Sequence, residues 1–113
     1  MFKSLEALLK PRRVVHAHCD LPCGVYDPAQ ARIEAESVAK IQEKYQDGDN
    51  QKKPSETLEE FKTRCLAIKE KRADLVKEHL WVLWTDYFKP QHLEHFPGLH
   101  DLFWQATKAA GDA

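Results

Sequence analysis

The sequence predicts an all-α fold, an antiparallel helical bundle. In residues 27–46 and 57–88, apolar side chains recur every three or four positions, the spacing that gathers them on one face of a helix. No segment shows the alternation of apolar and polar residues that is typical of a half-buried strand. Long helices without strands predict an antiparallel bundle.

The first helix is expected over residues 27–46. Asp27 is a suitable N-cap, and Pro28 follows at a position where its missing N–H costs no hydrogen bond. The polar, turn-forming residues 47–54 then predict a linker. The expected inner face of this helix consists of Ala31, Glu34, Val38, Ile41 and Tyr45.

The second helix is expected over residues 57–88, ending before Pro90. Thr57 and Glu60 have the spacing of a capping box, in which each side chain accepts the other residue's backbone N–H. Its inner positions alternate steps of three and four, which gives a heptad-like stripe. They are Leu58, Phe61, Cys65, Ile68, Arg72, Leu75, His79 and Val82.

The third helix is expected over residues 97–110, beginning near Pro97 and stopping at Gly111. Its expected inner face consists of Leu99, Leu102, Ala106 and Ala109. The histidines that surround its start match no zinc-site spacing; they are His92, His95 and His100. His79, on the inner face of the second helix, is expected to be a hydrogen-bonded core histidine.

Two charged residues, Glu34 and Arg72, occupy inner positions where the pattern calls for apolar side chains. Burying either charge alone would cost several kcal/mol, so each needs a partner. Pairing with each other would place an ion pair inside the bundle. The alternative is that both long side chains extend to solvent.

Length and composition define a small, ordinary globular protein. The chain has 113 residues, which is one domain, and a formal net charge of −1. This charge gives no reason to expect a nucleic-acid partner, and no apolar stretch has the length of a membrane span. We expect a soluble, cytoplasmic protein with no membrane association.

Residues 1–17 differ from the rest of the chain and are interpreted as a leader that is removed by proteolysis. Residues 11–13, Pro-Arg-Arg, interrupt the apolar run that a secretory signal needs, which argues against general export. Val15-His16-Ala17 resembles the small-residue pattern before a cleavage site. The alternative is an unprocessed amino-terminus.

The cysteine pattern does not define a disulfide framework, because the chain has three cysteines. Cys19 and Cys23 lie together near the start of the chain, and by themselves they fit a local disulfide, a redox dithiol or a metal clamp. Cys65 lies on the inner face of the second helix, where a buried structural thiol is expected.

Two runs of sequence carry a family resemblance. They are HCDLPCGVYDPAQARIEAES, which begins at His18, and IKEKRADLVKEHLWVLWTDYFKP, which begins at Ile68. Together they closely resemble the nickel-containing superoxide dismutase family, over about residues 15–110, with a longer linker near 47–56. The resemblance implies an enzyme that disproportionates superoxide to oxygen and hydrogen peroxide through a Ni(II)/Ni(III) cycle.

The resemblance also implies the metal ligands. Cleavage after Ala17 makes His18 the amino-terminal residue, which supplies its amine and, in the oxidised state, its imidazole. Cys19 supplies its backbone nitrogen and thiolate, and Cys23 supplies a second thiolate. Such donors suit square-planar Ni(II) and make its oxidation accessible. The predicted nickel hook spans residues 18–26, within a domain over residues 18–113.

Further residues around the metal are implied by the same resemblance. Glu34 orients the imidazole of His18, and Arg72 fixes Glu34. Tyr26 resembles the family's gate residue, which limits access to small anions. Tyr87 resembles a neighbour of this gate, although an aromatic residue packed between helices is an equal alternative.

The family resemblance also implies an assembly and raises a rival function. Family members are four-helix bundles that form homohexamers, and this sequence stops where a fourth helix is expected. We expect a homo-oligomer, a hexamer if the bundle is complete, and a leader-processing protease as a partner. The rival hypothesis is a non-enzymatic nickel- or zinc-binding module, inactive because it is truncated or unprocessed.

Overall fold

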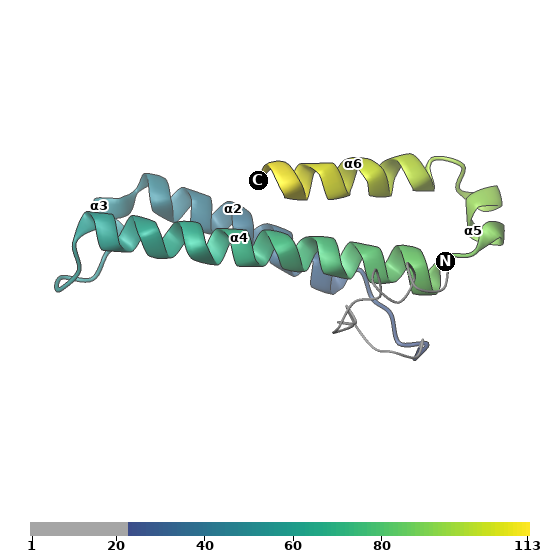
Figure 1. Cartoon of the computed structure of the whole chain (residues 1–113), viewed down its shortest axis with the longest axis horizontal. Coiled ribbons are helices and arrows are strands. Elements are labelled where there is room, and N and C mark those ends of the chain that lie inside the picture. Colours follow the sequence, from purple (N-terminus) through teal and green to yellow (C-terminus); the bar gives the residue numbers. More distant parts are fainter. Residues whose placement is uncertain (1–22) are drawn as a thin grey trace, which may run out of the picture.

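The computed structural model describes residues 23–113, and its regular structure there is entirely helical. The predicted leader, His18 and Cys19 lie outside the described residues. In chain order the elements are α2 (Ala29–Gln46), α3 (Gly48–Gln51), α4 (Leu58–Val82), the π-helical turn η1 (Leu83–Tyr87), α5 (Pro90–His95) and α6 (Leu99–Asp112). The predicted all-α, antiparallel fold is confirmed (Figure 1).

The longest helix, α4, is the axis of the structure. Helix α2 runs antiparallel along its first part, and α6 runs back along its second part (Figure 1). Apolar residues less than a tenth exposed form the core between these helices: Ala31, Phe61, Cys65, Ala73, Val76, Val82 and Leu83. The core is thin, because no large side chain in the described residues is completely buried.

Helix α2 begins two residues later than predicted, at Ala29, and ends at Gln46 as predicted. The side chain of Asp27 still acts as the predicted cap, because its Oδ1 accepts the backbone N–H of Ala29 at 2.9 Å. Pro28 forms the turn between the two.

The predicted linker contains one helical turn, α3. It forms because the carboxylate of Asp47 accepts hydrogen bonds from the side chains of Asn50 and Gln51, at 2.7 and 3.0 Å. Gly48 lets this turn approach α4 closely, since a Cβ at that position would lie 2.6 Å from Cδ1 of Leu58. The polar linker therefore folds back onto the start of α4.

The predicted capping box at the start of α4 is confirmed. Glu60 donates its backbone N–H to Oγ1 of Thr57 at 3.1 Å, and Thr57 donates its own to Oε2 of Glu60 at 2.9 Å. The far end of the predicted helix is not α-helical: the N–H of Phe88 bonds the carbonyl of Leu83, five residues back, at 3.0 Å. A wide π turn thus carries Tyr87 out of the α-helical register.

Parts of the predicted inner faces are wrong. Ile68, a predicted inner residue of the second helix, is 45% exposed. Ala73 and Val76, which were not among the predicted inner residues, are buried. The reason is that a strict repeat of 3.5 drifts around a straight helix of 3.6 residues per turn. On α6, Leu102 is 63% exposed, and Phe103 faces α4 instead, against Trp84.

The segment after α4 also differs from the prediction. Helix α5 was not expected, and α6 begins at Leu99 and continues through the predicted stop, Gly111, to Asp112. In the described residues only Gly24 has a positive φ, so Gly111 does not adopt the left-handed conformation that ends a helix. None of the described helices combines the length and the apolar character that crossing a membrane requires.

Candidate metal centre

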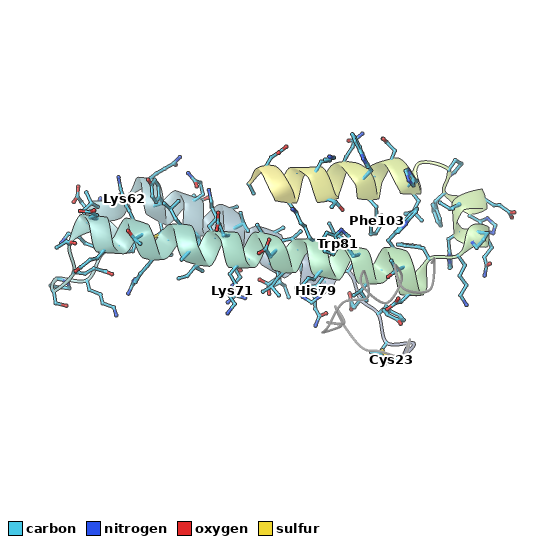
Figure 2. All side chains as sticks on the ribbon, in the orientation of Figure 1. Cys23, Lys62, Lys71, His79, Trp81 and Phe103 are labelled. Carbon is cyan, nitrogen blue, oxygen red and sulfur yellow. The ribbon has the colours of Figure 1, made fainter. Side chains whose placement is uncertain are left out.

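The described end of the predicted hook is a turn that leads into α2. Cys23 is exposed, and its Sγ lies 3.7 Å from the carbonyl oxygen of Val25, within hydrogen-bonding reach of sulfur. Gly24 has a φ of 77°, a left-handed conformation that glycine adopts without strain. Figure 2 shows Cys23 at the tip of this segment, away from the helices. The thiol is therefore accessible to a metal ion.

Tyr26 lies where this segment meets the helices. It is half-buried and lines a cavity of about 20 Å³, which is large enough for a single water molecule. The residues around this cavity come from the segment before α2, the start of α2, the end of α4 and the start of η1: Val25, Tyr26, Asp27, Gln30, His79, Val82 and Leu83. The junction of the two helices thus sets the position of Tyr26.

Tyr87 contacts Tyr26, with ring centroids 5.8 Å apart and planes inclined by 48°. It also packs edge-on against Phe88, at 5.2 Å, and stacks on His92, at 5.3 Å. Both interpretations of Tyr87 that the sequence left open therefore apply to it. It is a packed aromatic residue, and the structure brings it to the predicted gate.

The ion pair predicted from helical spacing is present. Nη1 of Arg72 on α4 donates to both carboxylate oxygens of Glu34 on α2, at 3.1 and 3.0 Å. The Glu34 side chain is 14% exposed and that of Arg72 is 42% exposed, so the pair is partly screened by solvent. It lies between the two extremes considered from the sequence, a buried pair and two solvated side chains.

Two histidines near Tyr26 and Tyr87 differ from expectation. His79 is half-buried beside the Tyr26 cavity and its imidazole makes no hydrogen bond to another described residue, so the predicted hydrogen-bonded core position is wrong. His92, which the sequence left without a role, stacks on Tyr87 and accepts the backbone N–H of Lys89 through Nδ1 at 2.9 Å. The available signal was its position three residues after Lys89, the N-cap residue of α5.

The described residues fit a nickel site that other residues complete. Within residues 23–113, no three His, Cys, Asp or Glu side chains are grouped closely enough to hold a metal ion. Of the predicted ligands only Cys23 is described, and its exposed sulfur is a soft donor of the kind that nickel bound by thiolates requires. The other predicted ligands, His18 and Cys19, lie outside this range.

The fold and this donor define a class of protein: a helical bundle whose first long helix is preceded by an exposed cysteine. The model of one family, nickel-containing superoxide dismutase, matches residues 13–113. The chain belongs to this family. Membership makes it an oxidoreductase that acts on superoxide and uses nickel as its cofactor.

Similar proteins span most of the chain. It is 53% identical to "Superoxide dismutase [Ni]" of Streptomyces coelicolor and 55% identical to that of Streptomyces seoulensis, each over 109 residues. Each match covers 96% of this chain and 77% of the relative.

A solved structure is also similar. It is a nickel-containing superoxide dismutase with nickel ligation corresponding to the oxidised state. This structure has 58% sequence identity and a TM-score of 0.72, over 84% of this chain and 74% of the other.

Proposed function

We propose that the chain disproportionates superoxide at a nickel ion held by His18, Cys19 and Cys23. One superoxide loses an electron and leaves as oxygen, and a second gains that electron and two protons and leaves as hydrogen peroxide. When bound, nickel supplies the one-electron couple that links the two halves. The supporting observation is the exposed Cys23 thiol beside the Tyr26 junction, in a chain whose family match includes the whole hook.

The ligand set explains why proteolysis would activate the protein. Before cleavage after Ala17, the backbone nitrogen of His18 is an amide, which is a poor donor unless it is deprotonated. After cleavage it is an amine. The amine, the amide nitrogen of Cys19 and two thiolates would then surround the metal with strong, electron-rich donors.

Glu34 and Arg72 would orient the imidazole of His18. A ligating histidine usually donates its second ring N–H to a carboxylate or carbonyl, which fixes the tautomer and the ring orientation. Arg72 holds Glu34 through a single nitrogen, Nη1, so the carboxylate keeps lone pairs for a further donor. The partial burial of Glu34 strengthens this interaction.

Tyr26 and Tyr87 would restrict access to the metal. Their rings lie 5.8 Å apart, between the segment that carries Cys23 and the π turn η1. Two bulky rings beside the metal would favour a diatomic anion over larger reductants and oxidants.

The finer properties of the protein are part of the same proposal. We infer a homo-oligomer of processed chains in the cytoplasm, a hexamer if the bundle is complete, with a protease that removes residues 1–17. Family membership favours the enzyme over the rival hypothesis of a non-enzymatic nickel- or zinc-binding module.

The ligand assignment is tested by comparing Cys19→Ser, Cys23→Ser and Cys65→Ala. Loss of a partner of a metal ligand typically costs about 10- to 100-fold in affinity or activity, so loss of a ligand itself should cost more. We expect both serine variants to lose nickel and dismutase activity while keeping their helix content. Cys65 is 6% exposed on α4, far from the hook in sequence, and its variant should keep nickel and activity.

Mass spectrometry, metal analysis and pulse radiolysis provide the measurements. Nickel-loaded wild-type protein should begin at His18 and carry one nickel per chain. Full turnover in either serine variant, or in protein that still begins at Met1, would contradict the proposal. Zinc in place of nickel, without turnover, would support the binding module.

A further inference from the structure

We propose that His92 is a positioning residue that holds the ring of Tyr87 against Tyr26. No role for His92 follows from the family resemblance set out above, and the inference rests on the proposed function because Tyr26 is its gate. Two separate contacts of the imidazole support it: a stack on Tyr87 and a hydrogen bond to the backbone of Lys89.

The stack on His92 restricts the orientation of the Tyr87 ring. The rings of His92 and Tyr87 are nearly parallel, inclined by 19° with centroids 5.3 Å apart. Phe88 meets both rings edge-on, at 5.2 Å from Tyr87 and 5.7 Å from His92. The three rings thus form one cluster, and a rotation of the Tyr87 ring would break its stack.

The second contact fixes the imidazole itself. The backbone N–H of Lys89 donates to Nδ1 of His92 at 2.9 Å, so Nδ1 is unprotonated and the ring proton of the neutral imidazole is on Nε2. Lys89 immediately precedes the first residue of α5, where backbone N–H groups lack partners within the helix. His92 therefore caps α5 with the same ring that it stacks on Tyr87.

Tyr87 needs this support because of its place in the chain. It is the last residue of the π turn, and the backbone becomes extended at Phe88. Its side chain is 45% exposed, so the helices hold only part of the ring. Apart from Phe88, the rings that contact it in the described chain are Tyr26 and His92. Without His92, only Phe88 and Tyr26 would remain as ring contacts of Tyr87 in the described chain.

The test separates the two contacts with four variants of the nickel-loaded enzyme. His92→Phe keeps a ring and removes the acceptor, His92→Asn keeps an acceptor and removes the ring, and His92→Ala removes both. His95→Ala is the matched control, because His95 lies on the same helix, is exposed, and its imidazole makes no ring contact or hydrogen bond with another described residue.

The expected result is a graded loss of turnover at constant nickel content. His92→Ala should lower kcat/KM for superoxide by about 3- to 10-fold, the scale of a lost aromatic contact. His92→Phe should recover part of the loss, and His95→Ala should match wild type. In a Tyr87→Ala background, His92→Ala should have no further effect, since residues that act as a unit are not additive.

Three outcomes would overturn the inference: wild-type kinetics in His92→Ala, no recovery in His92→Phe, or an unchanged loss in the Tyr87→Ala background. If His92→Ala fails to fold, His92→Phe and His92→Asn can be compared instead, each with Tyr87 present and in the Tyr87→Ala background. An inactive or nickel-free wild type would instead refute the proposed function. The two failures are therefore distinguishable.

Discussion

Helix α4 is packed differently by its two neighbours. Along α2 it buries Phe61 and Cys65, and the Glu34–Arg72 pair joins the two helices. Near α6 the ring contacts lie beyond the end of α4, where Phe103 is 5.8 Å from Trp84 on η1 and 5.1 Å from Phe88. No residue of α6 is buried.

The remainder of the α6 interface is an open apolar groove of about 420 Å³ between α2, α4 and α6. Its lining is rich in alanine, including Ala73 on α4 and Ala106 and Ala109 on α6. Burial supplies most of the stabilisation that offsets chain entropy. The difference therefore indicates that the α2–α4 pair is the stable unit, and that it carries the groups near the proposed metal centre.

The largest effect should come from the core of the stable unit. Phe61 is 6% exposed, so Phe61→Ala should lower the free energy of unfolding by about 3–5 kcal/mol. Phe103 is only half-buried, so Phe103→Ala should cost about 1–2 kcal/mol and act mainly on α6. Urea unfolding followed by circular dichroism measures the first effect, and hydrogen exchange along α6 measures the second. Equal costs, or uniform loss of protection in Phe103→Ala, would show that the two interfaces are one unit.

A smaller effect on stability should distinguish the partly buried ion pair of the stable unit from an exposed one. A double-mutant cycle on Glu34 and Arg72, with Gln at each position, should give a coupling of about 1–2 kcal/mol, because Glu34 is largely shielded from water. The matched control is Arg32–Glu36 on α2, with both side chains more than 60% exposed and an N–O distance of 2.9 Å, where about 0.3–0.5 kcal/mol is expected. A coupling free energy for Glu34–Arg72 no larger than that of the control pair would show that this ion pair does not stabilise the α2–α4 packing.

The smallest effect should appear at the far end of α2. The hydrogen bond from Asn50, followed by that from Gln51, lowers the pKa of Asp47 below its ordinary value. A lowered pKa stabilises the fold above about pH 4, the unfolded value, and this contribution is lost as pH falls through the folded pKa. Asn50→Ala should raise the pKa of Asp47, measured by NMR titration, and reduce stability at neutral pH more than at pH 3. An unchanged pKa of Asp47 in this variant would mean that the hydrogen bond from Asn50 does not lower it.

Much of the stable unit was predictable because its signals are local. The capping box at Thr57, the cap at Asp27 and the end of α2 each follow from residues a few positions apart. The Glu34–Arg72 pair was predicted because both charges interrupt an apolar face, and two unpaired charges would be costly there. The hook was predicted from a compact family motif, and the roles of His18, Cys19, Tyr26 and the ion pair remain proposals.

The second half of α4 and the segment after it were less predictable, because their structure depends on contacts between distant elements. The π turn at Leu83–Tyr87 has no sequence signature, and it changes the direction of Tyr87. Helix α5 is too short for a periodic pattern, so the position of His92 emerged only from the structure. On α6 the exposed Leu102 is no less apolar than Phe103, and only the partner rings on α4 determine which one faces inward.

The short connection between Gly24 and the Asp27 cap has a consequence for metal uptake. Only Val25 and Tyr26 separate the left-handed glycine from the residue whose carboxylate is bonded to α2. With Gly24, three residues of two soft backbone dihedrals each lie between Cys23 and this cap, so the segment that carries the thiol is short. Capture of an ion by that sulfur would then order little additional chain, and the entropic penalty of loading this side of the centre would be small.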